Sequence, residues 1–117
     1  MKHVYEPVAE SDGYRVLAER LWPRGESKAK AKLDAWEKEI APSADLRRWY
    51  GHDPDKWTEF RSRYERELAT PAAQAILDDL AERARRGTVT LVYASHAGAI
   101  SNSAVLLRLI EERITPA

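Results

Sequence analysis

The distribution of apolar residues along the chain predicts extended stretches near both ends. Residues 14–21 (YRVLAERL) have a valine and leucines to supply apolar faces, and residues 2–5 (KHVY) form a shorter stretch. Residues 88–94 (TVTLVYA) are the clearest strand, because a nearly continuous β-branched and aromatic run is typical of a sheet buried on both faces.

Residues 35–41 (AWEKEIA) are ambiguous. Their composition suits a helix, whereas Trp36, Lys38 and Ile40 alternate with glutamates as the residues of a half-buried strand do. We favour the strand, which gives four predicted strands in all.

Two helix starts stand out in the middle of the chain. Ser43 is a plausible cap for a helix over residues 44–51, and Asp53 followed by Pro54 predicts the start of the next helix. In that second helix the apolar residues lie three and four positions apart, which places them on one face that packs against a core. These residues are Trp57, Phe60, Tyr64 and Leu68.

Two more helices follow. One is predicted to begin after the break at Thr70 and Pro71 and to end at Gly87, and the other covers about residues 102–114. Strands separated by helices of this length predict an α/β three-layer sandwich, with a small, largely parallel sheet flanked by helices. The whole chain, residues 1–117, is expected to form one domain, since no linker divides it.

The first connection is the exception to this pattern. The segment between Tyr5 and Tyr14 is too short for a helical crossover between neighbouring parallel strands. The first strand is therefore expected to pair antiparallel or to lie at an edge, which would make the sheet mixed.

Charge and composition narrow the possible partners. Nineteen basic and nineteen acidic side chains balance, so no overall field attracts nucleic acid or a membrane surface, and a charged partner must be met locally. The absence of cysteine excludes thiol chemistry and fits a cytoplasmic protein. No signal core and no long apolar run is present, so a soluble protein is expected, and none of these features fixes an oligomeric state.

Polar residues gather where the predicted strands end. In open α/β sheets ligands bind beyond the carboxyl ends of the strands. The loops at those ends are expected to converge and form one cleft. Arginine suits a carboxylate or phosphate, Pro23 restricts the turn that presents it, and the last helix offers free backbone N–H groups. The expected ligand-binding residues are Arg20, Trp22, Arg24, Ser43 and Asn102.

A structural role for the same stretch, RLWPRG at residues 20–25, remains open. Arg20 could instead pair with a glutamate such as Glu19 or Glu39, and Trp22 could simply cover the end of the sheet.

Several segments resemble a known family, the short, YeaO-like branch of the domain of unknown function 488 (DUF488) family. They are residues 12–25 (DGYRVLAERLWPRG), 33–43, 46–57, 60–69 and 90–94. The resemblance implies the fold and the location of the site but supplies no reaction. Asn102 matches the family's asparagine, Glu19 replaces the family's aspartate, and His96 does not match the family's histidine by position.

Candidate catalytic residues are His52 in the GHDP turn, and Ser95 with the adjacent His96. No GxSxG motif supports a hydrolase, and the chain has neither an HExxH motif nor a glycine-rich phosphate loop. We therefore predict no metal and no cofactor.

Three functions remain open. The preferred one is a small-molecule-binding domain with an anion-binding cleft, and the second is an enzyme that uses His52 or His96 as acid or base, assisted by Ser43 or Ser95. The third is a regulatory protein that binds nucleic acid through residues 83–86 (RARR) and the arginines of 61–66. It is least favoured, because glutamates interleave with those arginines as on a solvated helix face.

Overall fold

The computed structural model describes residues 1–117 except 5, 21, 24, 26, 28–30, 95–99 and 115–117, and of His3 it describes the backbone alone. The strands are β1 (Lys2–His3), β2 (Tyr14–Leu17), β3 (Ala35–Trp36) and β4 (Val89–Tyr93). The α-helices are α2 (Ala44–Tyr50), α3 (Trp57–Glu67), α4 (Pro71–Arg86) and α5 (Asn102–Ile114). Three short 3-10 helices are η1 (Glu10–Asp12), η2 (Lys38–Ile40) and η3 (Pro54–Lys56).

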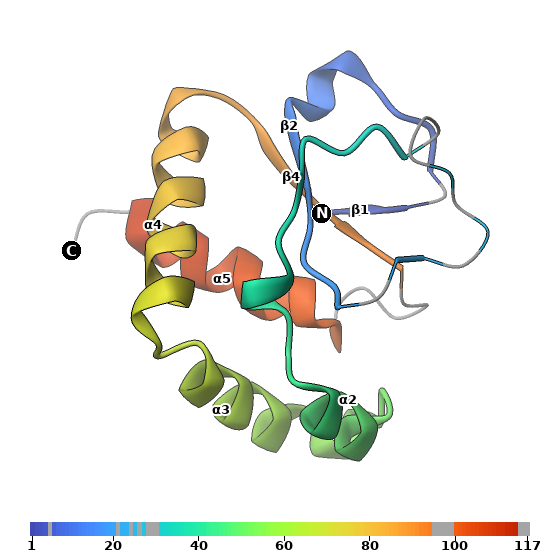
Figure 1. Ribbon diagram of the computed structural model, residues 1–117, viewed down its shortest axis with the longest axis vertical. Helices are drawn as coiled ribbons and strands as arrows, with labels where there is room; N and C mark the ends of the chain where they lie inside the picture. Colours follow the sequence, from blue (N-terminus) through green and yellow to red (C-terminus); the bar gives the residue numbers. More distant parts are fainter. Residues whose placement is uncertain are drawn as a thin grey trace.

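The sheet has the strand order β1-β4-β2-β3, and each of its pairings is parallel in the described residues. The predicted fold class, a small and largely parallel sheet flanked by helices, is confirmed (Figure 1). β1 lies at an edge as expected, but the expectation of a mixed sheet is wrong. β1 pairs with β4 rather than with β2, and it is only two residues long, so the return path to the start of β2 is short.

The main core lies between one face of the sheet and the helices. Val16 and Ala18 of the β2 region and Leu91 of β4 point into it. Figure 1 shows α4 and α5 side by side against the sheet, with α2 and α3 beyond the carboxyl ends of β2 and β4. The helical contribution consists of large apolar and aromatic side chains, among them Leu46, Tyr50, Phe60, Tyr64, Leu77, Leu80, Leu106 and Ile110.

The opposite face of the sheet carries a buried ion pair. Arg15 is only 2% exposed, and its Nη1 donates to Asp12 Oδ2 over 2.7 Å. Its Nε and Nη2 donate to Ala31 O, and Lys2 Nζ reaches Asp12 Oδ1 over 3.0 Å. A buried charge is costly unless it is paired and hydrogen-bonded, so these contacts tie β1, η1 and the backbone at Ala31 to this face.

The predicted caps are confirmed. Ser43 Oγ accepts from Leu46 N over 3.1 Å at the start of α2. Asp53 accepts from Asp55 N over 3.0 Å, and Pro54 begins η3, which leads into α3. Both side chains satisfy backbone N–H groups that have no partner inside a first helical turn.

The strand predicted over residues 35–41 is shorter than expected. β3 ends at Trp36, and η2 follows at once. The 3-10 turn lets Ile40 become fully buried in the main core, while Lys38 stays exposed and places its Nζ 4.0 Å from the centre of the Trp36 ring. Within the described residues, no helix is both long and apolar enough to cross a membrane.

Replacing Phe60 by alanine should lower the free energy of unfolding by about 3–5 kcal/mol, as large core truncations do. Phe60 is 1% exposed, and its ring stacks on Tyr50 with 4.0 Å between centroids. Urea denaturation measures the loss, with Glu65→Ala on the exposed side of the same helix as the control. An unchanged unfolding midpoint would contradict the packing of α3 described above.

Replacing Gly13 by alanine should destabilise the protein by more than about 2 kcal/mol. Gly13 has φ 63°, a conformation that strains other residues, and an added Cβ would lie 2.2 Å from Thr88 O, the acceptor for Tyr14 N. Gly87→Ala is the matched control, because Gly87 is extended and a Cβ there has no neighbour within 4 Å. Thermal denaturation should separate the two variants; equal melting temperatures would contradict the close approach at Gly13.

Candidate functional site

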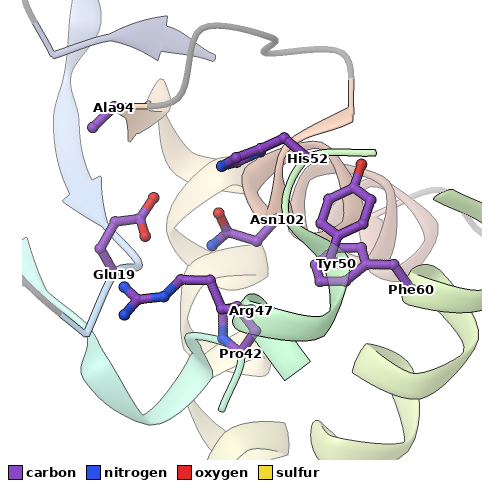
Figure 2. A pocket seen from close by; sticks show the side chains of 8 residues that line it. All are labelled: Glu19, Pro42, Arg47, Tyr50, His52, Phe60, Ala94 and Asn102. Carbon is purple, nitrogen blue, oxygen red and sulfur yellow. The ribbon is translucent and has the colours of Figure 1, made fainter. Parts of the chain in front are cut away.

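A pocket of about 240 Å³ lies beyond the carboxyl ends of β2 and β4, and we call it the strand-end pocket (Figure 2). Its position is the one expected for a ligand site in an open α/β sheet. Its walls come from the segments after β2 and after β4, the start of α5, the segment before α2, helices α2 and α3, and the turn after α2. They are Glu19, Pro42, Arg47, Tyr50, His52, Phe60, Ala94 and Asn102.

Two side chains hold the backbone beside Glu19. Asn102 Nδ2, at the first residue of α5, donates to Ala18 O over 2.7 Å. Trp36 Nε1, in β3, donates to Glu19 O over 2.6 Å. Hydrogen bonds from two different elements therefore fix the carbonyls of Ala18 and Glu19. They hold the backbone that carries the Glu19 side chain at the carboxyl edge of the sheet.

The carboxyl group of Glu19 is the most perturbed acid of the site. Burial raises its pKa to about 7, although the positive charge of Arg47 acts in the opposite direction. Within the described part of the chain, no hydrogen bond or ion pair engages this carboxyl group. A desolvated acid without a structural partner, placed in a cleft, is typical of a functional position.

Arg47 brings a positive charge to the same pocket. It lies on α2, is half-buried, and Figure 2 shows its guanidinium directed toward the space beside Glu19. Among the described residues its guanidinium has no hydrogen bond and no ion pair. Its neighbour Arg48 differs, because that side chain is 71% exposed and pairs with Asp45. Arg47 is thus a cation that faces a cavity and not solvent alone.

Aromatic rings form the wall opposite Glu19. The Tyr50 and Phe60 rings stack at 15° to one another, and the Tyr50 hydroxyl donates to Ile100 O over 2.7 Å. Burial raises the pKa of Tyr50, so its hydroxyl stays a neutral donor. His52 lies at the exposed rim, with its ring centroid 5.8 Å from that of Tyr50, and its ring points into the pocket in Figure 2.

Two residues that the sequence predicted for the site, Asn102 and His52, line the strand-end pocket. Arg20 is exposed, and its Nε donates to Pro42 O over 2.7 Å, so it is bound to the backbone of one pocket wall. Three further predicted residues, Arg24, Ser95 and His96, lie outside the described residues.

Trp22 and Ser43 lie away from the strand-end pocket. The Trp22 ring packs edge-on against Trp36, with 5.2 Å between centroids, and lines a separate hollow beside β3. Ser43 caps α2, and its backbone N–H donates to Glu67 Oε1 over 2.8 Å. Ser43 thus has the capping role predicted for it, and Trp22 contacts Trp36 of β3.

Six of the eight lining residues were not predicted for the site, and three of these six carry polar groups: Glu19, Arg47 and Tyr50. Glu19 carried a signal, because an acid directly after a buried apolar strand lies at the carboxyl edge of the sheet. Arg47 lies one turn after the Ser43 cap and therefore near the same edge, but the sequence does not show which of the neighbours Arg47 and Arg48 faces the pocket. Within the described residues, no three metal-ligating side chains gather at one point.

Glu19→Gln should stabilise the protein at alkaline pH. Between its ordinary pKa of 4.5 and its folded pKa of about 7, the folded chain holds a proton at Glu19 that the unfolded chain releases. Folding therefore becomes less favourable as the pH rises through this window. The variant should match the wild type near pH 4.5 and exceed its unfolding free energy by up to about 3 kcal/mol at pH 8.

Denaturant titrations of both proteins from pH 4.5 to 8 measure this difference. Glu39→Gln, which replaces an exposed acid on η2, is the control and should track the wild type throughout. A Glu19→Gln protein with the same pH profile as the wild type would contradict the burial of the Glu19 carboxyl group.

Comparisons with known proteins identify the family. A family model described as "Inactive DUF488-N3 subclade" matches residues 1–116. Uncharacterized protein Rv3073c of Mycobacterium tuberculosis is 43% identical, over 94% of this chain and 91% of the relative. Uncharacterized protein YeaO of Escherichia coli is 42% identical, over 80% of each chain. No solved structure matches the chain. The resemblance read from the sequence is confirmed, and the chain belongs to the DUF488 family.

Proposed function

We propose that this protein binds a small anionic molecule in the strand-end pocket and does not transform it. The observation that carries the proposal is the Arg47 guanidinium, which faces the pocket without a hydrogen bond or ion pair among the described residues. A planar guanidinium with free N–H groups suits a carboxylate or phosphate. The volume of about 240 Å³ lies below the usual range for drug-sized ligands, so the ligand is small.

The start of α5 supports the same ligand class. Asn102 is the first residue of this 13-residue helix and lines the pocket. The partial positive charge at the start of a helix favours a nearby anion. Arg47 thus takes the part that the sequence suggested for Arg20, whose Nε is engaged with Pro42 O, while Arg24 lies outside the described residues.

An enzyme that uses the same pocket is the second candidate, and one observation favours it. Burial raises the pKa of Glu19 to about 7, which suits an acid or base near neutral pH, and His52 lines the same pocket. The description of the matching family model, an inactive subclade, supports binding over catalysis.

Nucleic acid is the least supported partner. The arginines of residues 83–86 are engaged on their own helix: Arg83 pairs with Asp79, and both Arg85 and Arg86 pair with Glu82. Their charges are therefore partly neutralised at the surface.

The absence of cysteine supports a cytoplasmic location.

Anions should raise the melting temperature of the wild-type protein, and Arg47→Ala should abolish the rise. The experiment adds sulfate, phosphate or propanoate at pH 6, where the Glu19 carboxyl group is mostly protonated and repels an anion least. A ligand that binds the folded state alone at 100 times its Kd adds about 2.7 kcal/mol to stability. Arg47→Lys should respond more weakly than the wild type, because lysine keeps the charge and loses the two-pronged donor.

Arg48→Ala is the matched control for this experiment. It removes an exposed arginine from the next position of the same helix, so general ionic-strength effects should act equally on it and on Arg47→Ala. If Arg47→Ala responds to the anions as strongly as the wild type and Arg48→Ala do, the proposal is wrong.

A further inference from the structure

We infer that the ligand of the strand-end pocket is a zwitterion of the amino-acid type, with an ammonium group for Glu19 beside the carboxylate for Arg47. The inference rests on the proposed function and deepens it, because it names a second charged group that the ligand must carry. Both side chains line the same small cavity, and Figure 2 shows their charged ends directed into it.

The first argument is that Glu19 and Arg47 do not form an ion pair within the described residues. Opposite charges in a partly desolvated cavity attract strongly and normally close onto each other. The backbone of Glu19 is held by Asn102 and Trp36, and Arg47 is carried by α2, whose start is fixed by the Ser43 cap. Each charge is thus carried by a backbone that other elements hold in place, and both residues line the strand-end pocket.

The second argument is that each side chain lacks what a zwitterion supplies. In the described part of the chain, the Glu19 carboxyl group accepts no hydrogen bond and the Arg47 guanidinium donates none. A simple anion would satisfy Arg47 and leave Glu19 facing a like charge. An ammonium group placed at Glu19 would remove that repulsion and complete both sites at once.

The titration of Glu19 agrees with this geometry. Burial raises its pKa to about 7, and a ligand ammonium would favour the ionised form again. Among the described residues, the titratable and charged groups around it include Arg20 from its own segment, Arg47 and Tyr50 from α2, His52 from the turn after α2, and Tyr64 from α3. Asn102 and Ala94, from the α5 and β4 sides, are uncharged.

The remaining walls suit the rest of an amino acid. The stacked Tyr50 and Phe60 rings, together with Pro42 and Ala94, form apolar surface next to the two charges. Such surface accepts an apolar side chain.

Calorimetric titration at pH 8 with three matched sets of probes tests the inference. Each set holds an amino acid, its deaminated acid and its decarboxylated amine. The sets are glycine with acetate and methylamine, leucine with 4-methylpentanoate and 3-methylbutylamine, and phenylalanine with 3-phenylpropanoate and 2-phenylethylamine. In at least one set the amino acid should bind at least tenfold more tightly than both of its partners.

The Glu19→Gln variant isolates the ammonium contact. It should lose the preference for the amino acid over the deaminated acid while still binding the acid, and Arg47→Ala should lose both ligands. Glu39→Gln should keep the wild-type preference. At pH 6 the preference of the wild type for the amino acid should be smaller than at pH 8, because the Glu19 carboxyl group is mostly protonated there. The preference of the His52→Gln variant should decrease between pH 8 and pH 6 by the same factor.

The outcomes separate this inference from the proposed function. If the deaminated acids bind as tightly as the amino acids, or if Glu19→Gln keeps the preference, the ligand is a simple anion and the inference alone is overturned. If only the amines bind, or if no probe binds, the proposed anion site fails together with the inference.

Discussion

The hydrogen bond from Asn102 to the carbonyl of Ala18 is the contact on which the site depends. It joins the first residue of α5 to the backbone directly after β2, two elements separated by more than eighty residues of sequence. A buried carbonyl left without a donor would be costly, so the amide both stabilises this junction and sets the distance between the helix start and Glu19. Tyr64 interacts with the Asn102 side chain, and its hydroxyl donates to Ile40 O.

The acid at this junction lowers the stability of the fold near neutral pH. The core behind the pocket is dense, with Phe60 and Tyr64 fully buried and Tyr50 stacked on Phe60. In front of that core the fold holds an acid whose ionised form opposes folding at neutral pH. Ion pairs that serve only structure, such as Arg15 with Asp12 on the far face, are closed and hydrogen-bonded. Within the described residues Glu19 and Arg47 are not paired in this way, and the proposed site rests on that difference.

Sequence patterns predicted the elements well and the site in part. Caps such as Ser43 and Asp53, and the spacing of Phe60 and Tyr64, depend on neighbours within a few positions, which a single sequence displays. The edge of the sheet where the pocket opens was also predictable from the order of strands and helices. The residues at that edge were predicted only in part. Asn102 and His52 were among them, but Arg47 was not, because the direction of its side chain depends on how α2 packs against α3, a tertiary contact with no local signal. The same applies to β3, where burial of Ile40 in the main core overrides the alternation that favoured a longer strand.

The strand order has a consequence for how this chain is made. β4 lies between β1 and β2, yet it follows all of α2, α3 and α4 in the sequence. During synthesis from the amino end, β1 and β2 leave the ribosome long before β4, the strand that joins them. Of the strand pairings in the described residues, the pairing of β2 with β3 alone can form early. The helices can pack first. The pairing of β1 with β4 forms late, because its partners Lys2 and Val92 lie at almost opposite ends of the chain. The pocket at the end of β2 and β4 therefore forms among the last features of the nascent protein.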